Sequence, residues 1–179
     1  MANKIMYGIK SVYYSVLTNG EYGTPKALAG AVSINMESQG DINNFYADDT
    51  VYWKGVANNG YEGDLELALI PDDFRTDVLG ETTDDNGLLV ENEAASPVSF
   101  ALMFEFTGDA NARRHVFYNC VATRPAVSSN TKEDAIEPQT QTITISATAN
   151  ADGYVKASAE PTATNWAQWF QTVQTPTFA

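Results

Sequence analysis

Apolar and polar residues alternate with a period of two in several separate stretches of this 179-residue chain. Successive side chains of a β-strand point to opposite faces, so the alternation gives each strand one apolar and one polar face. In 141–148, for example, Ile143 and Ile145 alternate with Thr142 and Thr144. The pattern predicts half-buried strands with one wet face. It occurs in 28–36, 65–69, 98–106 and 141–148.

Turn-forming residues separate these stretches from other apolar segments. Gly108-Asp109-Ala110-Asn111 connects 98–106 to a second apolar stretch, 113–122, which predicts a β-hairpin. Further strands are expected near 7–17, 51–57 and 154–157, each bounded by Asn-Gly or Asp-Gly turns. The predicted fold class is mainly β and mostly antiparallel.

Two segments have helical patterns instead. In 71–80, a proline at the start, two aspartates in the first turn and a final glycine predict a two-turn helix. In 164–173, Trp166, Trp169, Phe170 and Val173 have the i, i+3, i+4, i+7 spacing of an amphipathic helix, with Thr164 as its N-cap. We expect this second helix to pack on the sheet through its aromatic face.

Three stretches are interpreted as long loops: 37–50, 81–96 and 125–140. Loops of this length are uncommon in compact domains and are often functional. We expect a neighbouring subunit to order them.

The composition is that of one acidic globular domain spanning 1–179. Hydrophobic residues make up 44% of the chain, which disfavours disorder. The net charge of −13 disfavours binding to nucleic acid or to an anionic membrane, because both are negatively charged. No stretch resembles a signal peptide or a membrane span, so we expect synthesis in the cytoplasm. With Cys120 as the only cysteine, the chain cannot form an internal disulfide.

The sequence offers few candidate catalytic residues. His115 is the only histidine, and its odd offset from Cys120 on the predicted strand 113–122 would put the two side chains on opposite faces. They could not then act as a base and a nucleophile. No nucleotide-binding glycine motif is present. We therefore expect no enzymatic activity and no cofactor.

Acidic pairs and exposed aromatic residues leave two alternatives open. Asp48-Asp49, Asp72-Asp73 and Asp84-Asp85 could suggest calcium binding or a hydrolase with two carboxylates, but helix-start and turn chemistry explains them adequately. Trp53 and Tyr52 could stack on sugars, as in a carbohydrate-binding β-sandwich. Both functions remain alternatives to a structural role.

Charge is unevenly distributed along the chain. Residues 72–93 contain eight acids and one arginine, whereas 113–124 contains three arginines and no acid. Either both segments form an ordinary solvated surface, or the acidic segment of one subunit binds the arginines of the next. The second interpretation makes the following residues a candidate subunit interface: Glu81, Asp84, Asp85, Glu91, Glu93, Arg113, Arg114 and Arg124.

Several separate motifs resemble those of the major tail proteins of long-tailed bacteriophages (siphophages) and related prophages. They occur in the order expected of that family, and the resemblance covers roughly Met6 to Trp169. The motifs are Gly60-Tyr61-Glu62-Gly63-Asp64-Leu65-Glu66-Leu67-Ala68-Leu69-Ile70-Pro71-Asp72-Asp73-Phe74, Phe100–Phe106, Arg114–Cys120, Arg124-Pro125, Ile136–Thr140 and Asp152-Gly153.

The resemblance implies an antiparallel β-sandwich or barrel-like tail-tube fold with a flanking helix and a short second helix. It further implies that the chain assembles with itself into hexameric rings, which stack into the tail tube of the virion. Tape-measure, tail-tip and tail-terminator proteins would be its other partners. DNA would pass through the lumen without specific binding, and an acidic lumen would repel its phosphates.

Within this interpretation, the predicted loop 37–50 is the candidate for contacts between stacked rings. Its apolar residues lie in an otherwise polar stretch, which also fits a loop folded back on its own core. The candidate ring-stacking residues are Asp41, Phe45, Tyr46, Asp48 and Asp49.

Overall fold

The fold was analysed in a computed structural model that describes residues 5–131 and 138–178. The elements of its largest sheet are β1 (Ile9–Thr18), β2 (Glu21–Tyr22), β3 (Lys26–Ala27), β4 (Ala31–Ser38), β7 (Tyr61–Leu67), β10 (Phe100–Phe106), β11 (Arg114–Ala122), β12 (Gln141–Ala147) and β13 (Lys156–Ala159). The remaining elements are β5 (Ile42–Ala47), β6 (Thr50–Val56), α1 (Asp72–Asp77), β8 (Thr82–Thr83), β9 (Leu89–Val90) and a 3-10 turn at Trp166–Gln168. The predicted mainly β, antiparallel fold class is confirmed.

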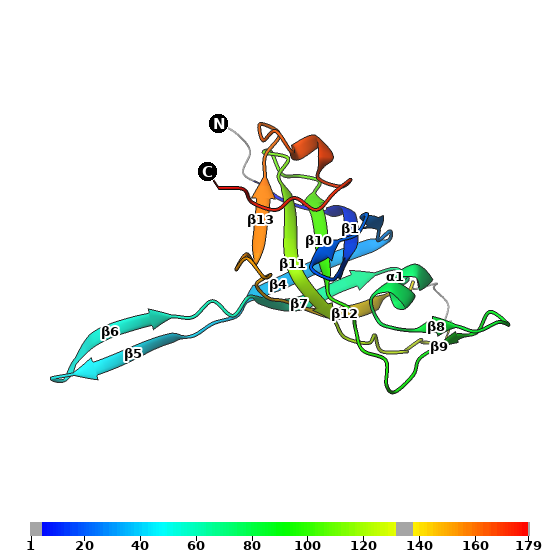
Figure 1. Cartoon of the computed structure of the whole chain (residues 1–179), viewed down its shortest axis with the longest axis horizontal. Helices are drawn as coiled ribbons and strands as arrows, with labels where there is room; N and C mark the ends of the chain where they lie inside the picture. Colours follow the sequence, from blue (N-terminus) through cyan, green and yellow to red (C-terminus); the bar gives the residue numbers. More distant parts are fainter. Residues whose placement is uncertain (1–4, 132–137, 179) are drawn as a thin grey trace.

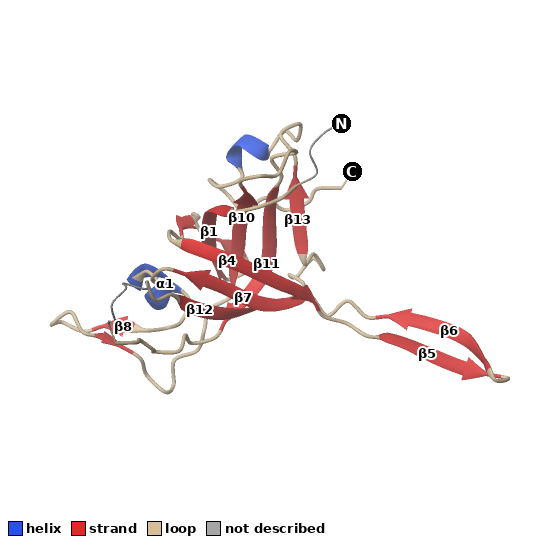
Figure 2. Ribbon diagram, turned by 180° about the vertical axis from the view of Figure 1, so that it is seen from behind, coloured by secondary structure: helices blue, strands red, loops and turns tan. Residues whose placement is uncertain are grey.

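The large sheet bends into two layers because β11 is shared between them. The strand order is β2-β1-β10-β11-β12-β7-β4, and every pairing is antiparallel. The first part of β11 pairs with β13 through 114–117, and its last part pairs with β12 through 120–122. Strands β4, β7 and β12 therefore cross the direction of β10, β11 and β13 (Figures 1 and 2).

The main core lies between these two layers. It contains buried side chains from β1, β7, β10, β11, β12 and α1, with Phe74 of α1 packed edge-on against Tyr14 and Phe100. A second cluster, around Met103 and Tyr118, lies on the opposite face of β10 and β11. Strand 98–106 was expected to be half-buried, and this prediction is wrong. Both of its faces are covered, because the C-terminal segment packs over the second one.

Two apolar residues were assigned to the core face incorrectly. Leu69 is exposed because β7 ends at Leu67, and Val32 is exposed because the register of β4 shifts between Ala31 and Ser33. The same β4–β7 pair requires a glycine at position 63. The Asn35 carbonyl oxygen lies only 1.8 Å from the place where a Cβ of Gly63 would be.

The first predicted helix is confirmed and the second is not. α1 follows Pro71, has Asp72 and Asp73 in its first turn, and is followed by Gly80 at a φ of +78°. In 164–173 the structure has only the 3-10 turn, preceded by Asn165 and not Thr164. The aromatic residues still pack as expected, with Trp169 buried against the sheet and Phe170 stacked on Tyr13. Threonine, asparagine and the aromatic residues of this segment favour a helix only weakly, so tertiary packing determines its conformation.

The predicted loops differ among themselves. Segment 37–50 is not a loop, because it contains the end of β4, all of β5 and the start of β6. Segment 81–96 contains the short pair β8–β9. In 125–140, residues 125–131 and 138–140 are without helix or strand, and 132–137 lie outside the described residues.

Candidate assembly surfaces

Residues 39–59, here called the arm, form a two-stranded ribbon that extends away from the rest of the molecule, the body (Figures 1 and 2). Its strands β5 and β6 pair only with each other. The turn consists of Asp48 and Asp49, whose φ values of 50° and 58° fit a two-residue type I′ hairpin turn. At the base, the amide of Gln39 donates to the carbonyl of Gly60 at 2.8 Å. The acidic pair Asp48-Asp49 therefore has a structural role, because it forms the turn that joins β5 to β6.

The surface of the arm is unusually apolar. Phe45 and Trp53 face each other across the two strands, and each is 59% exposed. The indole of Trp53 lies over Gly55, where a Cβ would come within 2.2 Å of the ring. Exposed apolar surface of this extent is typical of interaction sites. Its exposed large hydrophobic residues are Ile42, Phe45, Tyr46, Val51, Tyr52, Trp53 and Val56.

All five candidate ring-stacking residues lie on the arm. Phe45 and Tyr46 are in β5, Asp48 and Asp49 form the tip, and Asp41 lies at the base, where its carbonyl accepts a hydrogen bond from the Ala57 amide at 3.1 Å. None of them folds back on the body core. The loop conformation predicted for this segment is wrong, and its role in ring stacking stays a prediction.

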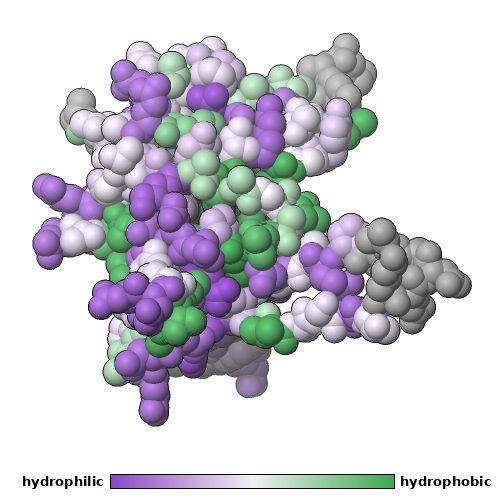
Figure 3. All heavy atoms as spheres, turned by 90° about the vertical axis from the view of Figure 1, so that its right-hand side faces the viewer, coloured by the Kyte–Doolittle hydropathy of each residue, from purple (hydrophilic) through white to green (hydrophobic). Residues whose placement is uncertain are grey.

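The acidic candidates occupy a lobe formed by residues 81–96. Glu81 is buried, and its carboxylate accepts hydrogen bonds from Arg75 Nε at 3.0 Å. Asp84 closes the β8–β9 turn by accepting from the amides of Leu88 and Asn86, and these hydrogen bonds lower the pKa of its carboxyl group. Hydrophilic side chains surround smaller apolar patches on the face that the lobe shares with α1 (Figure 3). The other acidic candidates, Asp85, Glu91 and Glu93, are exposed.

Each arginine of the candidate interface has an acidic partner within its own chain. Arg113 pairs with Glu160, and Arg124 pairs with Glu91 of the lobe. Of these pairs, only Arg124 with Glu91 joins the acidic segment 72–93 to the basic segment 113–124. Both pairs are exposed and therefore contribute little to stability.

Arg114 is different, because it is largely buried. Its Nε donates to Glu105 at 3.1 Å, and its guanidinium lies 3.6 Å from the ring centre of Trp166 and 4.7 Å from that of Phe170. These contacts attach the C-terminal segment to the sheet. Arg114 thus has a structural role within the monomer. Whether these charges also meet across a subunit boundary stays a prediction.

A second acidic surface was missed at the sequence level. The outward face of β4, β7 and β12 carries four carboxylates and no basic residue, interspersed with hydroxyl and amide side chains. The sequence signal was available, since acids recur at every second position from 62 to 66. We call this surface the acidic face, and its carboxylates are Glu37, Glu62, Asp64 and Glu66.

The only histidine and cysteine lie on the same side of β11, contrary to the prediction. His115 stacks on Phe104 at 5.3 Å between ring centres, and Cys120 belongs to the same core. The reason is a bulge at Asn119, whose φ is +42° and where the pairing of β10 with β11 shifts register. Phe117 lies between the two residues in the strand, and full burial raises the pKa of the Cys120 thiol. This arrangement is not that of a catalytic pair.

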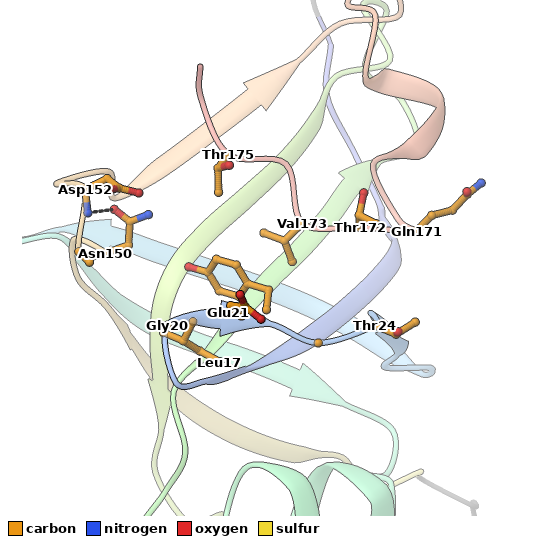
Figure 4. Close-up of a pocket in the computed structure, with 13 residues that line it drawn as sticks. Leu17, Gly20, Glu21, Thr24, Asn150, Asp152, Gln171, Thr172, Val173 and Thr175 are labelled. Atoms are coloured by element: carbon orange, nitrogen blue, oxygen red, sulfur yellow. Dashed lines mark hydrogen bonds between the residues drawn. The ribbon is translucent and has the colours of Figure 1, made fainter. Parts of the chain in front are cut away.

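The described residues offer no other chemical centre. Among residues 5–131 and 138–178, no three His, Cys, Asp or Glu side chains are grouped so as to hold a metal ion. A cavity of about 480 Å³ lies beneath the C-terminal segment, lined in part by Glu21, Tyr22, Asn150, Asp152 and Gln171 (Figure 4). No tryptophan lines it, so the only exposed stacking platform among the candidates for sugar binding is on the arm.

Comparison with known proteins identifies the family. The sequence profile of the phage tail tube protein family matches residues 4–178. A search of curated proteins found no match. In the described part of the chain, no helix has the length and apolar character needed to span a bilayer. The chain therefore belongs to the phage tail tube protein family, whose members are structural components of the virion tail.

Proposed function

We propose that this protein assembles into hexameric rings that stack into the tube of a siphophage tail, through which DNA leaves the virion. Assembly takes place in the host cytoplasm, where tail-tip, tape-measure and tail-terminator proteins start the tube, set its length and end it. Membership of the tail tube family supports the structural role. Ring number and DNA passage rest on the resemblance described above.

The observation that carries the proposal is the arm. A two-stranded ribbon is at best marginally stable in water by itself, and this one exposes seven large hydrophobic residues. In the monomer it pairs with no other strand. A second copy that covers the arm would remove this apolar area from water, which is the main driving force for association. The arm is therefore the contact between successive rings.

The acidic face is suited to the wall of the lumen. Its four carboxylates would repel the phosphates of DNA, and its serine and threonine hydroxyls keep it hydrated. Strand β4 ends the large sheet, so its outer edge is available to pair with a strand of a neighbouring copy. A ring built through such edges would turn the same face of every subunit towards the axis.

The exposed charges of the lobe and the exposed arginines on either side of β11 are the candidates for contacts within the ring. Asp85 and Glu93 have no ion pair among the described residues, and the exposed Arg113 and Arg124 could exchange their partners across a boundary at little cost. Charge reversal at Arg113 tests this contact, because it leaves the buried Arg114 cluster intact. Unchanged assembly of this variant at physiological salt would refute the contact.

Negative-stain electron microscopy and light scattering test the proposal directly. The concentrated protein should form rings or hollow tubes. A variant in which a Gly-Gly turn replaces 40–58 should remain a soluble monomer with the thermal stability of the full chain. Removing 40–48 alone would leave β6 without its partner, so the whole ribbon must be replaced. Normal tubes from the armless variant would refute the role of the arm. A strict monomer that binds glycans through Trp53 would instead favour a carbohydrate-binding module.

A further inference from the structure

The body of the molecule contains a groove whose chemistry complements that of the arm. Two adjoining hollows, of about 220 and 260 Å³, share Ile34 and Phe106 and run beside strand β4. We call them together the β4 groove. Its lining is mainly apolar and includes Met6, Ile9, Met36, Tyr61, Phe104 and Phe117.

One buried polar atom and one exposed cation of the groove have no polar partner among residues 5–131 and 138–178. The Nε2 atom of His115 is buried and makes no hydrogen bond to these residues, although its ring is held between Phe104 and Phe106. Lys156 is exposed, makes no ion pair with them and lies 4.4 Å from the ring centre of Tyr61. Among the described lysines and arginines, only Lys156 and Lys54 lack an acidic partner. A buried unpaired nitrogen is costly, so a hydrogen bond to it would be favoured. Because Nε2 has almost no accessible surface, a docked group can reach it only after the imidazole ring turns towards the groove.

The arm offers the complementary groups. Its exposed aromatic residues match the apolar lining, and the hydroxyl groups of Tyr46 and Tyr52 can hydrogen-bond to the imidazole of His115 once that ring turns towards the groove. Its tip carries Asp48 and Asp49, which match the charge of Lys156. The large cavity beneath the C-terminal segment fits less well, because its lining carries Glu21 and Asp152 and no basic residue.

From these observations we infer that the arm of one copy docks in the β4 groove of a second copy, with its aromatic residues over His115 and its acidic tip at Lys156. This inference rests on the proposed function and names the receptor of the arm. The groove lies next to the free edge of β4, so docking would add to any pairing along that edge. The contact is heterologous, since arm and groove are different surfaces, and it can repeat along a tube.

Site-specific photocrosslinking tests the inference in the full chain. Tyr46 is replaced by p-benzoylphenylalanine, which retains an aromatic side chain, and the variant is assembled from a mixture of nitrogen-14 and nitrogen-15 protein. Mass spectrometry then distinguishes links between copies from links within one copy. Links between copies that map to 34–36, 104–106, 115–117 or 156–157 would support the inference. Tubes whose links from position 46 map elsewhere would overturn it and leave the proposed function standing.

Charge exchange provides a second and independent measurement. Lys156→Glu should raise the critical concentration for tube growth at least about tenfold, because it places like charges opposite each other. Asp48→Asn combined with Asp49→Gly, which removes both charges from the tip and keeps residues suited to the type I′ turn, should partly restore assembly of that variant. Asp152→Lys, which changes an exposed acid outside the groove, is the matched control and should have little effect. Undiminished assembly of Lys156→Glu would overturn the inference. A wild-type protein that forms neither tubes nor links between copies would count against the proposed function itself.

Discussion

The hairpins β10–β11 and β5–β6 have similar local structure and opposite surroundings. Both are antiparallel, both contain aromatic residues and both include a register shift. β10 and β11 are covered on both faces, by β7 and β12 on one side and the C-terminal segment on the other. β5 and β6 are covered on neither. The two hairpins thus share their local structure, while long-range packing decides whether the aromatic residues stabilise the monomer or stay exposed to solvent.

Truncation of one aromatic residue in each hairpin should separate these two roles, with the largest effect in the body. Phe100→Ala should lower the free energy of unfolding by about 3–5 kcal/mol, because the ring is fully buried. Trp53→Ala should change the stability of the monomer by less than about 0.5 kcal/mol, since the ring is exposed. Urea unfolding of both variants at a concentration that keeps the protein monomeric measures the difference.

The assembly assay should give the opposite order for the arm. Trp53→Ala should impair tube growth although its monomer is as stable as the wild type. A Trp53→Ala monomer that lost several kcal/mol of stability would show that the arm packs on the body in solution. The arm would then not be an uncovered hairpin.

The sequence predicted the elements of the body well, because alternation and turn residues are local signals. Strand 141–148 and the hairpin of 98–106 with 113–122 were found with nearly correct bounds. The errors have long-range causes. The burial of Met103 depends on a segment that lies more than sixty residues further along the chain, and the bulge that moves Cys120 depends on the pairing with β10.

The candidate site was predicted in part. The arm was located from Phe45 and Tyr46, but its mostly polar residues 41–44 concealed a strand, which can form because both of its faces are wet. The acidic face was missed although Glu62, Asp64 and Glu66 alternate. Only the pairing of β7 with β4 and β12 brings these acids together with Glu37 on one face.

Arg113, just before β11, and Arg114, its first residue, provide an intermediate test of what burial adds to a charged contact. Arg114→Gln should lower the free energy of unfolding by about 1.5 kcal/mol, because Glu105 is then left partly buried without its main charged partner. Arg113→Gln should lower it much less, since the pair of Arg113 with Glu160 is exposed. Thermal unfolding of both variants at low and high salt would check this. Equal losses of stability from the two variants would mean that burial adds nothing to the contact between Arg114 and Glu105.

The smallest effect concerns pH and the groove. Burial, together with the positive charge of Arg113, lowers the pKa of His115 below its ordinary value of 6.5. The unfolded chain therefore binds a proton at a higher pH than the folded chain does, so stability should decline modestly as pH falls below about 6.5. His115→Phe should remove this part of the decline, which urea unfolding between pH 7 and pH 5 can measure.

If the arm of a second copy hydrogen-bonds to His115, assembled tubes should lose less stability in mild acid than monomers do, because protonation would no longer leave the ring without a partner. Equal acid sensitivity of tubes and monomers would mean that His115 has no additional hydrogen bond in the tube. The arm of a second copy would then not contact His115.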